Sequence, residues 1–219
     1  MDVSNFVSVC SQIIGGFGRT LLIFFVTLVF SMPLGLLVAR GRMSGIGFIK
    51  RIIQFIISVL RGTPLMLQLI VVFYGPYFLL GMKLSSSWRM MAVMIGFSIN
   101  YSAYFGEIFR AGFEAVPPGQ MEAARVLGYS RFQTYWKITF PQMVKRVIPP
   151  VTNEVITLAK DTSLAFALAY TEMFTLAKQI AAAQSNIAPL FVAGLFYYIF
   201  NFVVAWVMEQ IEKKLSYYN

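Results

Sequence analysis

Two apolar stretches of the sequence carry polar side chains at a spacing that suits solute binding. Glu154 and Asp161 are seven residues apart, so they share one face of an α-helix, with Thr157 beside them. Asn100 and Glu107 repeat this spacing on an earlier stretch. Ionisable groups at membrane depth are costly and usually face an aqueous cavity or the protein interior. The pattern therefore predicts a polar path for a solute. Its substrate-binding residues would be Asn100, Glu154, Thr157 and Asp161.

Such stripes also arise where neighbouring helices exchange hydrogen bonds, and this alternative is favoured for Glu107, which lies beside Arg110. Acid–base catalysis is disfavoured because the chain has no His, and because Glu154 and Asp161 lie on one helix instead of facing each other from two. The single Cys10 and the absence of His remove the usual zinc and haem ligands, so no metal site is expected.

The segment RGTP, residues 61–64, interrupts an otherwise continuous apolar region from 46 to 80. Thr63 suits a helix N-cap and Pro64 a first helical position, so a new helix is expected from Leu65 and the span is expected to be discontinuous. Half-helix N-termini point at anionic substrate groups in transporters, and Thr63 with Arg61 would face such a group. The alternative is a proline kink near the interface, with Arg61 reaching to lipid headgroups.

Composition places these residues in a membrane protein. The chain of 219 residues is 58% hydrophobic and 12% charged, with a mean hydropathy of +0.70, whereas soluble domains have about 25% charged residues. A net charge of +9 could suggest a nucleic-acid partner, but the charges fall in short loops between apolar runs. No nucleic acid is therefore expected, and the charges report topology instead.

Apolar runs of about 20 residues, long enough to cross a bilayer, predict an all-α integral membrane protein with five transmembrane helices. Four of them lie near 20–39, 88–109, 147–168 and 188–208, and a fifth lies between 46 and 81. No linker divides them, so residues 1–219 are expected to form a single transmembrane domain.

Lysine and arginine alternate along the loops as the positive-inside rule requires. The basic residues of the loops expected to be cytoplasmic are Arg40, Arg42, Lys50, Arg51, Arg110, Arg125, Arg131, Lys137, Lys145, Arg146, Lys213 and Lys214. The other loops hold only Lys83, Arg89 and Lys178. The N-terminus is therefore expected outside the cell and the C-terminus in the cytoplasm.

The charged segment EAARVLGYSRFQTYWKITFPQ, residues 122–142, lies in the largest of the cytoplasmic loops, at about 114–142. Pro117 and Pro118 before it and Gly128 within it predict a short helix that begins and ends sharply. Ser130 can cap a second, interfacial helix, expected to end before Pro141. By pattern alone this loop could simply lie on the membrane.

The order Glu122-Ala123-Ala124, Gly128, Ile138, Pro141 resembles the EAA signature of importer permeases of the ATP-binding-cassette superfamily. Phe140 stands where the signature usually has Leu, which keeps an apolar side chain. The segments RGTPLMLQL (61–69) and NEVITLAKDTSLAFAL (153–168) are similar to those of the polar amino acid branch. The resemblance runs from the first span to the C-terminus.

The resemblance implies a type I importer permease fold in the bacterial plasma (inner) membrane, with a cytoplasmic coupling helix. The residues expected to contact a cytoplasmic ATPase subunit are Glu122, Ala123, Ala124, Arg125 and Gly128. The sequence has no G-x-x-x-x-G-K-[ST] phosphate loop, so ATP and magnesium are expected on that partner and no cofactor on this chain. A second permease subunit, identical or different, and an extracytoplasmic solute-binding protein are the other expected partners.

The expected function is therefore a non-enzymatic permease subunit that imports an amino acid by alternating access. Glu154 and Asp161 favour a substrate with a basic side chain, because two carboxylates exceed what one α-ammonium needs; a neutral polar amino acid such as glutamine is the alternative. A self-contained secondary transporter or channel subunit is the rival function. Five spans do not divide into the two similar halves that secondary transporters usually show.

Overall fold

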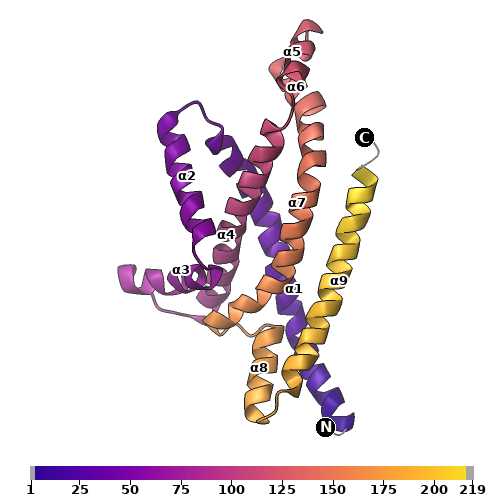
Figure 1. Cartoon of the computed structure of the whole chain (residues 1–219). Helices are drawn as coiled ribbons and strands as arrows, with labels where there is room; N and C mark the ends of the chain where they lie inside the picture. Colours follow the sequence, from indigo (N-terminus) through magenta and orange to yellow (C-terminus); the bar gives the residue numbers. More distant parts are fainter. Residues whose placement is uncertain (1–2, 216–219) are drawn as a thin grey trace.

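The computed structural model describes residues 3–215, and every regular element in that range is helical (Figure 1). The elements are α1 (Val3–Arg42), α2 (Gly47–Gly62), α3 (Leu65–Leu80), α4 (Ser86–Glu114), α5 (Pro118–Val126), α6 (Arg131–Thr134), the π-helical η1 (Tyr135–Thr139), α7 (Phe140–Asp161), the 3-10 helix η2 (Thr162–Leu168), α8 (Met173–Ala183) and α9 (Ala188–Leu215). The predicted all-α class is confirmed.

The long helices α1, α4, α7 and α9 form a bundle with two distinct ends (Figure 1). At one end, called here the α8 end, α8 lies beside the start of α1. At the other, the α5 end, α5 and α6 project beyond the long helices. Residues 6–42 and 188–215 are long and apolar enough to cross a membrane. Helices α2 and α3 are long and apolar enough to cross a membrane only when they are taken together, and they are bent by 111° at the break between them. The predicted discontinuity of this region is therefore confirmed.

The helix bounds differ from the predicted spans at several points. Helix α1 begins far before the predicted 20–39, at Val3, and ends shortly after it, at Arg42, and α4 covers the predicted 88–109. Helix α7 ends at Asp161, so residues 162–168 continue as a 3-10 helix and not as the end of a span. The count of five membrane-spanning helices stays a prediction.

Helices α1 and α4 approach closely through small residues. A Cβ atom added to Gly35 of α1 would lie 2.8 Å from the Phe105 Cβ of α4, and one added to Gly106 would collide with Val38. Small residues at such crossings let helix backbones pack closely in membranes. The fully buried side chains Phe97 and Phe105 extend this contact into the core of the bundle. The α1–α4 pair therefore forms the frame on which the other elements are placed.

The predicted coupling helix has the expected ends. Pro118 is its first residue, α5 ends at Val126, and Gly128 follows with a φ of +76°, a left-handed conformation that glycine adopts without strain. Ser130 caps the next helix: its hydroxyl accepts from the Gln133 N–H, and the Gln133 side chain accepts from the Ser130 N–H.

The prediction that this second helix ends before Pro141 is wrong. Helical structure continues from α6 through η1 into α7, so Pro141 lies inside a helical run. A proline clashes with the carbonyl four residues before it and cannot donate a hydrogen bond. The π-helical turn accommodates this defect, because the Phe140 N–H bonds to the Tyr135 carbonyl five residues earlier.

Candidate functional site

A cavity of about 380 Å³ lies between the α2–α3 break, α4, α7 and η2. We call it the central cavity. Its lining residues are Thr63, Pro64, Leu65, Asn100, Tyr101, Tyr104, Glu154, Thr157, Asp161 and Leu164. All five residues predicted to bind substrate thus line one space, although three separate stretches of sequence supply them. Tyr101 and Tyr104 are additional lining residues that the sequence pattern did not indicate.

The two acids of α7 lie in different surroundings within the central cavity. Asp161, the last residue of α7, accepts a hydrogen bond of 2.8 Å from the hydroxyl of buried Tyr101. Glu154 accepts no hydrogen bond and forms no ion pair at contact distance within the described range 3–215, although the positive charge of Arg61 acts on it. None of the ten lining residues is basic. The cavity therefore carries two carboxyl groups without a lining cation.

The α2–α3 break is closed by side-chain amides. The Gln68 Nε2 lies within hydrogen-bond distance of the Leu60 carbonyl (2.8 Å) and of the carbonyl and hydroxyl oxygens of Thr63 (3.1 and 2.8 Å). The Asn100 Nδ2 donates to the Gln68 Oε1 at 3.0 Å and to the Leu60 carbonyl at 3.2 Å. These amides satisfy carbonyls that the end of α2 leaves without helical partners.

The prediction that Thr63 caps α3 is wrong. Thr63 is the last residue associated with α2, and its hydroxyl donates to the Val59 carbonyl at 2.8 Å. The residue that precedes α3 is Pro64, which has no side-chain hydrogen bond to offer. Pro64 is therefore the N-cap and not the first helical residue, but the predicted start of the new helix at Leu65 is confirmed. The proline ring prevents α2 from continuing.

Arg61 lies at the rim between two cavities. Its guanidinium carbon is 5.1 Å from the centre of the Tyr104 ring, a cation–π contact with a residue of the central cavity. Arg61 also lines a neighbouring space of about 390 Å³ toward the α5 end. Glu107, Arg110 and Arg146 contribute charged groups to that second space.

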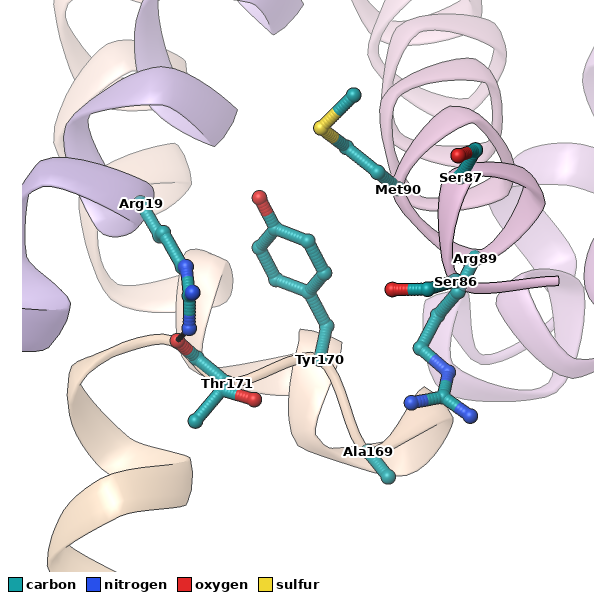
Figure 2. Close-up of a pocket in the computed structure, with 8 residues that line it drawn as sticks. All are labelled: Arg19, Ser86, Ser87, Arg89, Met90, Ala169, Tyr170 and Thr171. Atoms are coloured by element: carbon teal, nitrogen blue, oxygen red, sulfur yellow. Dashed lines mark hydrogen bonds between the residues drawn. The ribbon is translucent and has the colours of Figure 1, made fainter.

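A further cavity, of about 260 Å³, opens at the α8 end (Figure 2). We call it the α8-end cavity. It is lined by Arg19, Ser86, Ser87, Arg89, Met90, Ala169, Tyr170 and Thr171. The Arg19 guanidinium donates to the Thr171 carbonyl at 2.8 Å, which fixes the segment after η2 to α1.

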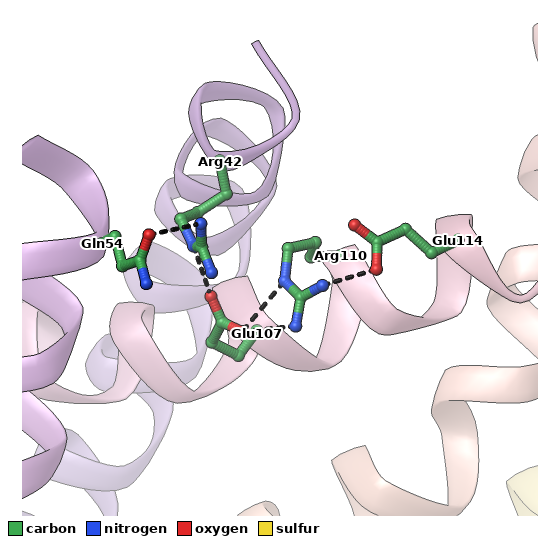
Figure 3. A network of polar contacts seen from close by, with 5 residues as sticks. All are labelled: Arg42, Gln54, Glu107, Arg110 and Glu114. Atoms are coloured by element: carbon green, nitrogen blue, oxygen red, sulfur yellow. Dashed lines mark hydrogen bonds and ion pairs between the residues drawn. The ribbon is translucent and has the colours of Figure 1, made fainter. Parts of the chain in front are cut away.

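At the α5 end, a network of ion pairs and a hydrogen bond joins α1, α2 and α4 (Figure 3). Glu107 accepts from the Arg42 Nε at 2.9 Å and from the Arg110 Nη2 at 2.7 Å, and Arg110 also pairs with Glu114. Arg42 also reaches Gln54 of α2 at 3.4 Å. The prediction that Glu107 is held by neighbouring hydrogen bonds is confirmed. This network ties the end of α4 to α1 and α2 directly before the α5 loop.

The α5 segment presents most of the residues predicted to contact an ATPase. Glu122, Ala123 and Arg125 are exposed, whereas Ala124 is buried against its own chain. Large apolar side chains accompany them on the surface, with Val126 88% and Leu127 73% exposed. An apolar surface on a projecting loop is typical of a protein contact. The sequence pattern had not singled out Val126 and Leu127.

Three comparisons with known proteins agree. Residues 31–217 match the family model "Binding-protein-dependent transport system inner membrane component". The arginine transport system permease protein ArtQ of Bacillus subtilis (strain 168) is 33% identical over 217 residues, which cover 99% of this chain and 98% of that protein. The L-cystine transport system permease protein TcyB of the same organism is 34% identical over 207 residues, covering 93% of this chain and 86% of the relative.

Solved structures show the same architecture. The crystal structure of an amino acid ABC transporter with histidines superposes with a TM-score of 0.87 at 29% identity, over 98% of this chain and 99% of that one. The MetNI methionine ABC transporter, in an inward-facing conformation, gives a TM-score of 0.75 at 16% identity, over 99% and 100% of the two chains. The second likeness concerns the fold alone.

Proposed function

We propose that this chain carries amino acids with a basic side chain. It belongs to the family of inner-membrane components of binding-protein-dependent transport systems, and it is the permease subunit of an amino acid ABC importer. The observation that carries this proposal is the central cavity, whose lining includes Glu154 and Asp161 and no basic residue. Charge pairing is stronger in such a partly dehydrated space than at a surface, although desolvation offsets part of the gain.

The aromatic lining supports a cationic side chain. Tyr104 faces the central cavity and already holds the guanidinium group of Arg61 against its ring. A substrate guanidinium or ammonium can use the same ring face when Arg61 moves aside. The relative ArtQ is named for arginine transport, which agrees with this chemistry. Other relatives are named for glutamine or L-cystine, so a neutral polar amino acid is the second candidate.

The substrate carboxylate would lie at the start of α3. Pro64 and Leu65 line the central cavity, and the first N–H groups of a helix have no partners within the helix. The Asn100 amide and the Thr63 hydroxyl already have partners in the break, so they would position α3 and make weaker direct contacts to substrate. In this arrangement Thr157 lies between Glu154 and Asp161 on the wall that receives the cationic end.

The substrate proposal is tested by uptake into reconstituted vesicles. We expect Glu154→Gln and Asp161→Asn to reduce arginine uptake about tenfold or more, because each removes one charge that pairs with the substrate cation. Glutamine uptake, if present, should change much less. Arginine, glutamine and glutamate are compared in each variant, with Thr152→Ser on the same helix as the control. Equal activity with all three substrates, unchanged by both substitutions, would remove these acids from the site.

We further propose that the α5 end is cytoplasmic and the α8 end faces outward, in a bacterial inner membrane. Most of the arginine and lysine residues lie near the α5 end, as the positive-inside rule requires. ATPase subunits, which supply ATP and magnesium, would bind α5 through Glu122, Ala123, Arg125 and Gly128. The solute-binding protein would dock at the α8 end, and a second permease subunit, identical or different, would complete the path. Residues 114–142 form the coupling loop.

The proposed orientation predicts which positions an impermeant thiol reagent reaches in sealed cells. In a Cys10→Ser background, Ser85→Cys and Gln184→Cys are expected to react from outside, whereas Ser130→Cys is expected to react only after permeabilisation. The cytoplasmic position expected for Ser216 lies outside the described residues, and Ser216→Cys extends the test to it. External labelling of Ser130→Cys would overturn both the orientation and the coupling proposal.

A further inference from the structure

The α8-end cavity is positively charged without a counter-ion. It contains two guanidinium groups, those of Arg19 and Arg89, and none of its eight lining residues, all within the described range, is acidic. The Arg89 Nε is buried and has no hydrogen-bond partner among those residues. The guanidinium carbon of Arg89 lies 5.8 Å from the Phe73 ring, so one side of this group is held by an aromatic face.

The shape of this cavity is fixed by the chain itself. Figure 2 shows the guanidinium groups of Arg19 and Arg89 on opposite sides of the segment 169–171, with the Ser86 hydroxyl directed between them. The hydrogen bond from Arg19 to the Thr171 carbonyl holds that segment in place. Tyr170 is only 8% exposed, and its hydroxyl makes no hydrogen bond to a described residue. Donor groups on a held framework favour an anion.

The charge pattern distinguishes between possible anions. A free amino acid would bring an α-ammonium group into a cavity that offers it no carboxylate, and a basic amino acid would bring a second positive charge. A carboxylate that belongs to a protein side chain brings no such cation. Under the proposed orientation this cavity also lies on the face where a solute-binding protein docks.

We propose that the α8-end cavity is a socket for an acidic side chain of the solute-binding protein. Arg89 would pair with the carboxylate beside the Ser86 hydroxyl, and Arg19, across segment 169–171, would add its positive charge while it holds that segment. The inference rests on the proposed function and on the proposed orientation of the chain.

The position of the socket connects docking to the transport path. Asn100 follows Arg89 by eleven residues on α4, about 16 Å along the helix, so the socket lies almost directly outward of the central cavity. The 3-10 helix η2 links the two, because Leu164 lines the central cavity and Ala169 lines the socket. A carboxylate bound at Arg89 would therefore contact the same segment that continues into the lining of the central cavity.

The test is a titration of the reconstituted complex, with its ATPase subunits, against the solute-binding protein that supports its uptake. Arg89→Gln should raise the half-saturating concentration of that protein about tenfold, because it removes a charge-assisted hydrogen bond. Lys83→Gln removes one positive charge from the same end but outside the cavity, and should stay within about twofold of wild type. Added salt should reduce the difference between Arg89→Gln and wild type.

A double-mutant cycle identifies the partner group. Acidic residues on the surface of the solute-binding protein are replaced one at a time, Glu by Gln and Asp by Asn. One of these substitutions should weaken docking to the wild-type permease about tenfold but hardly change docking to the Arg89→Gln permease. Arg19→Gln could loosen the 169–171 segment, so Arg89→Gln is the deciding variant, and its assembly with the ATPase is checked by co-purification. Wild-type half-saturation in assembled Arg89→Gln would overturn the socket. Absence of binding-protein-dependent uptake in wild type would instead overturn the proposed function.

Discussion

Replacing Gly128 with valine is expected to lower amino acid uptake at least tenfold while the chain still inserts into the membrane. Gly128 has a φ of +76°, and a β-branched residue is strained there by about 1–3 kcal/mol. Apart from Gly128 and its two chain neighbours, no residue of this chain comes within 4 Å of the position that a Cβ would take, so the effect must come from the backbone or from a partner. The strained turn would misplace α5 relative to the ATPase. Uptake, ATP hydrolysis and subunit stoichiometry are measured together.

Gly128→Asn is the matched control for this result. Asparagine tolerates the left-handed region better than most residues, so its uptake should stay near that of wild type if the backbone conformation is what matters. Glu122→Lys tests the same surface in another way, because it replaces a negative charge by a positive one on an exposed side chain of α5. We expect weaker association of the ATPase subunits in that variant. Wild-type uptake and stoichiometry in both Gly128→Val and Glu122→Lys would contradict the coupling proposal.

The second large effect is expected from Asn100→Leu, which should reduce uptake at least tenfold and lower stability by about 1–3 kcal/mol. The substitution keeps the approximate size of the side chain but removes both hydrogen bonds from Asn100, leaving the Gln68 Oε1 without a donor. The α2–α3 break would then lose its hydrogen bonds to Asn100 of α4, while the bond from Trp88 to the Phe73 carbonyl and the packing of Leu69 on Gly96 remain. Thermal unfolding in detergent and substrate-dependent uptake are the measurements.

Two comparisons separate the structural role of Asn100 from substrate binding. Gln68→Leu should resemble Asn100→Leu, and the double variant should be little worse than either, because the two amides form one network. Ser98→Ala, on the same helix and without a side-chain hydrogen bond in the described range, should match wild type. An unchanged unfolding temperature with a raised half-saturating substrate concentration would instead make Asn100 a substrate ligand.

The sequence predicted the local features best, because their causes lie within a few residues. Pro118, Gly128 and Ser130 each act on the backbone directly beside them, and the structure places α5 and the following cap where they indicate. The stripe formed by Glu154 and Asp161 was also predictable, since helical periodicity alone places them on one face. These residues do line the same cavity.

Features that depend on distant contacts were not predictable in the same way. Pro64 indicated a break, but the bend of 111° depends on Gln68 and Asn100, which meet only in the folded chain. Pro141 by its type predicts a helix end, whereas the π-helical turn that carries the helix past it has no comparably simple sequence signal. Tyr104 lies in an apolar run of the sequence, where an aromatic residue is expected to face lipid. Its position in the cavity that also holds Glu154 and Asp161 could therefore not be inferred from the sequence.

The bend between α2 and α3 also constrains the order in which this chain can mature. Residues 47–80 leave the ribosome as one long apolar stretch, which a translocon can accept as a single hydrophobic segment. The amide that fixes the bend, Asn100, is synthesised 32 residues after Gln68 and belongs to α4. Gln68 can bond to Leu60 and Thr63 before α4 is made, but the hydrogen bonds from Asn100 form only once α4 is beside the break, so a chain arrested before Asn100 would lack them.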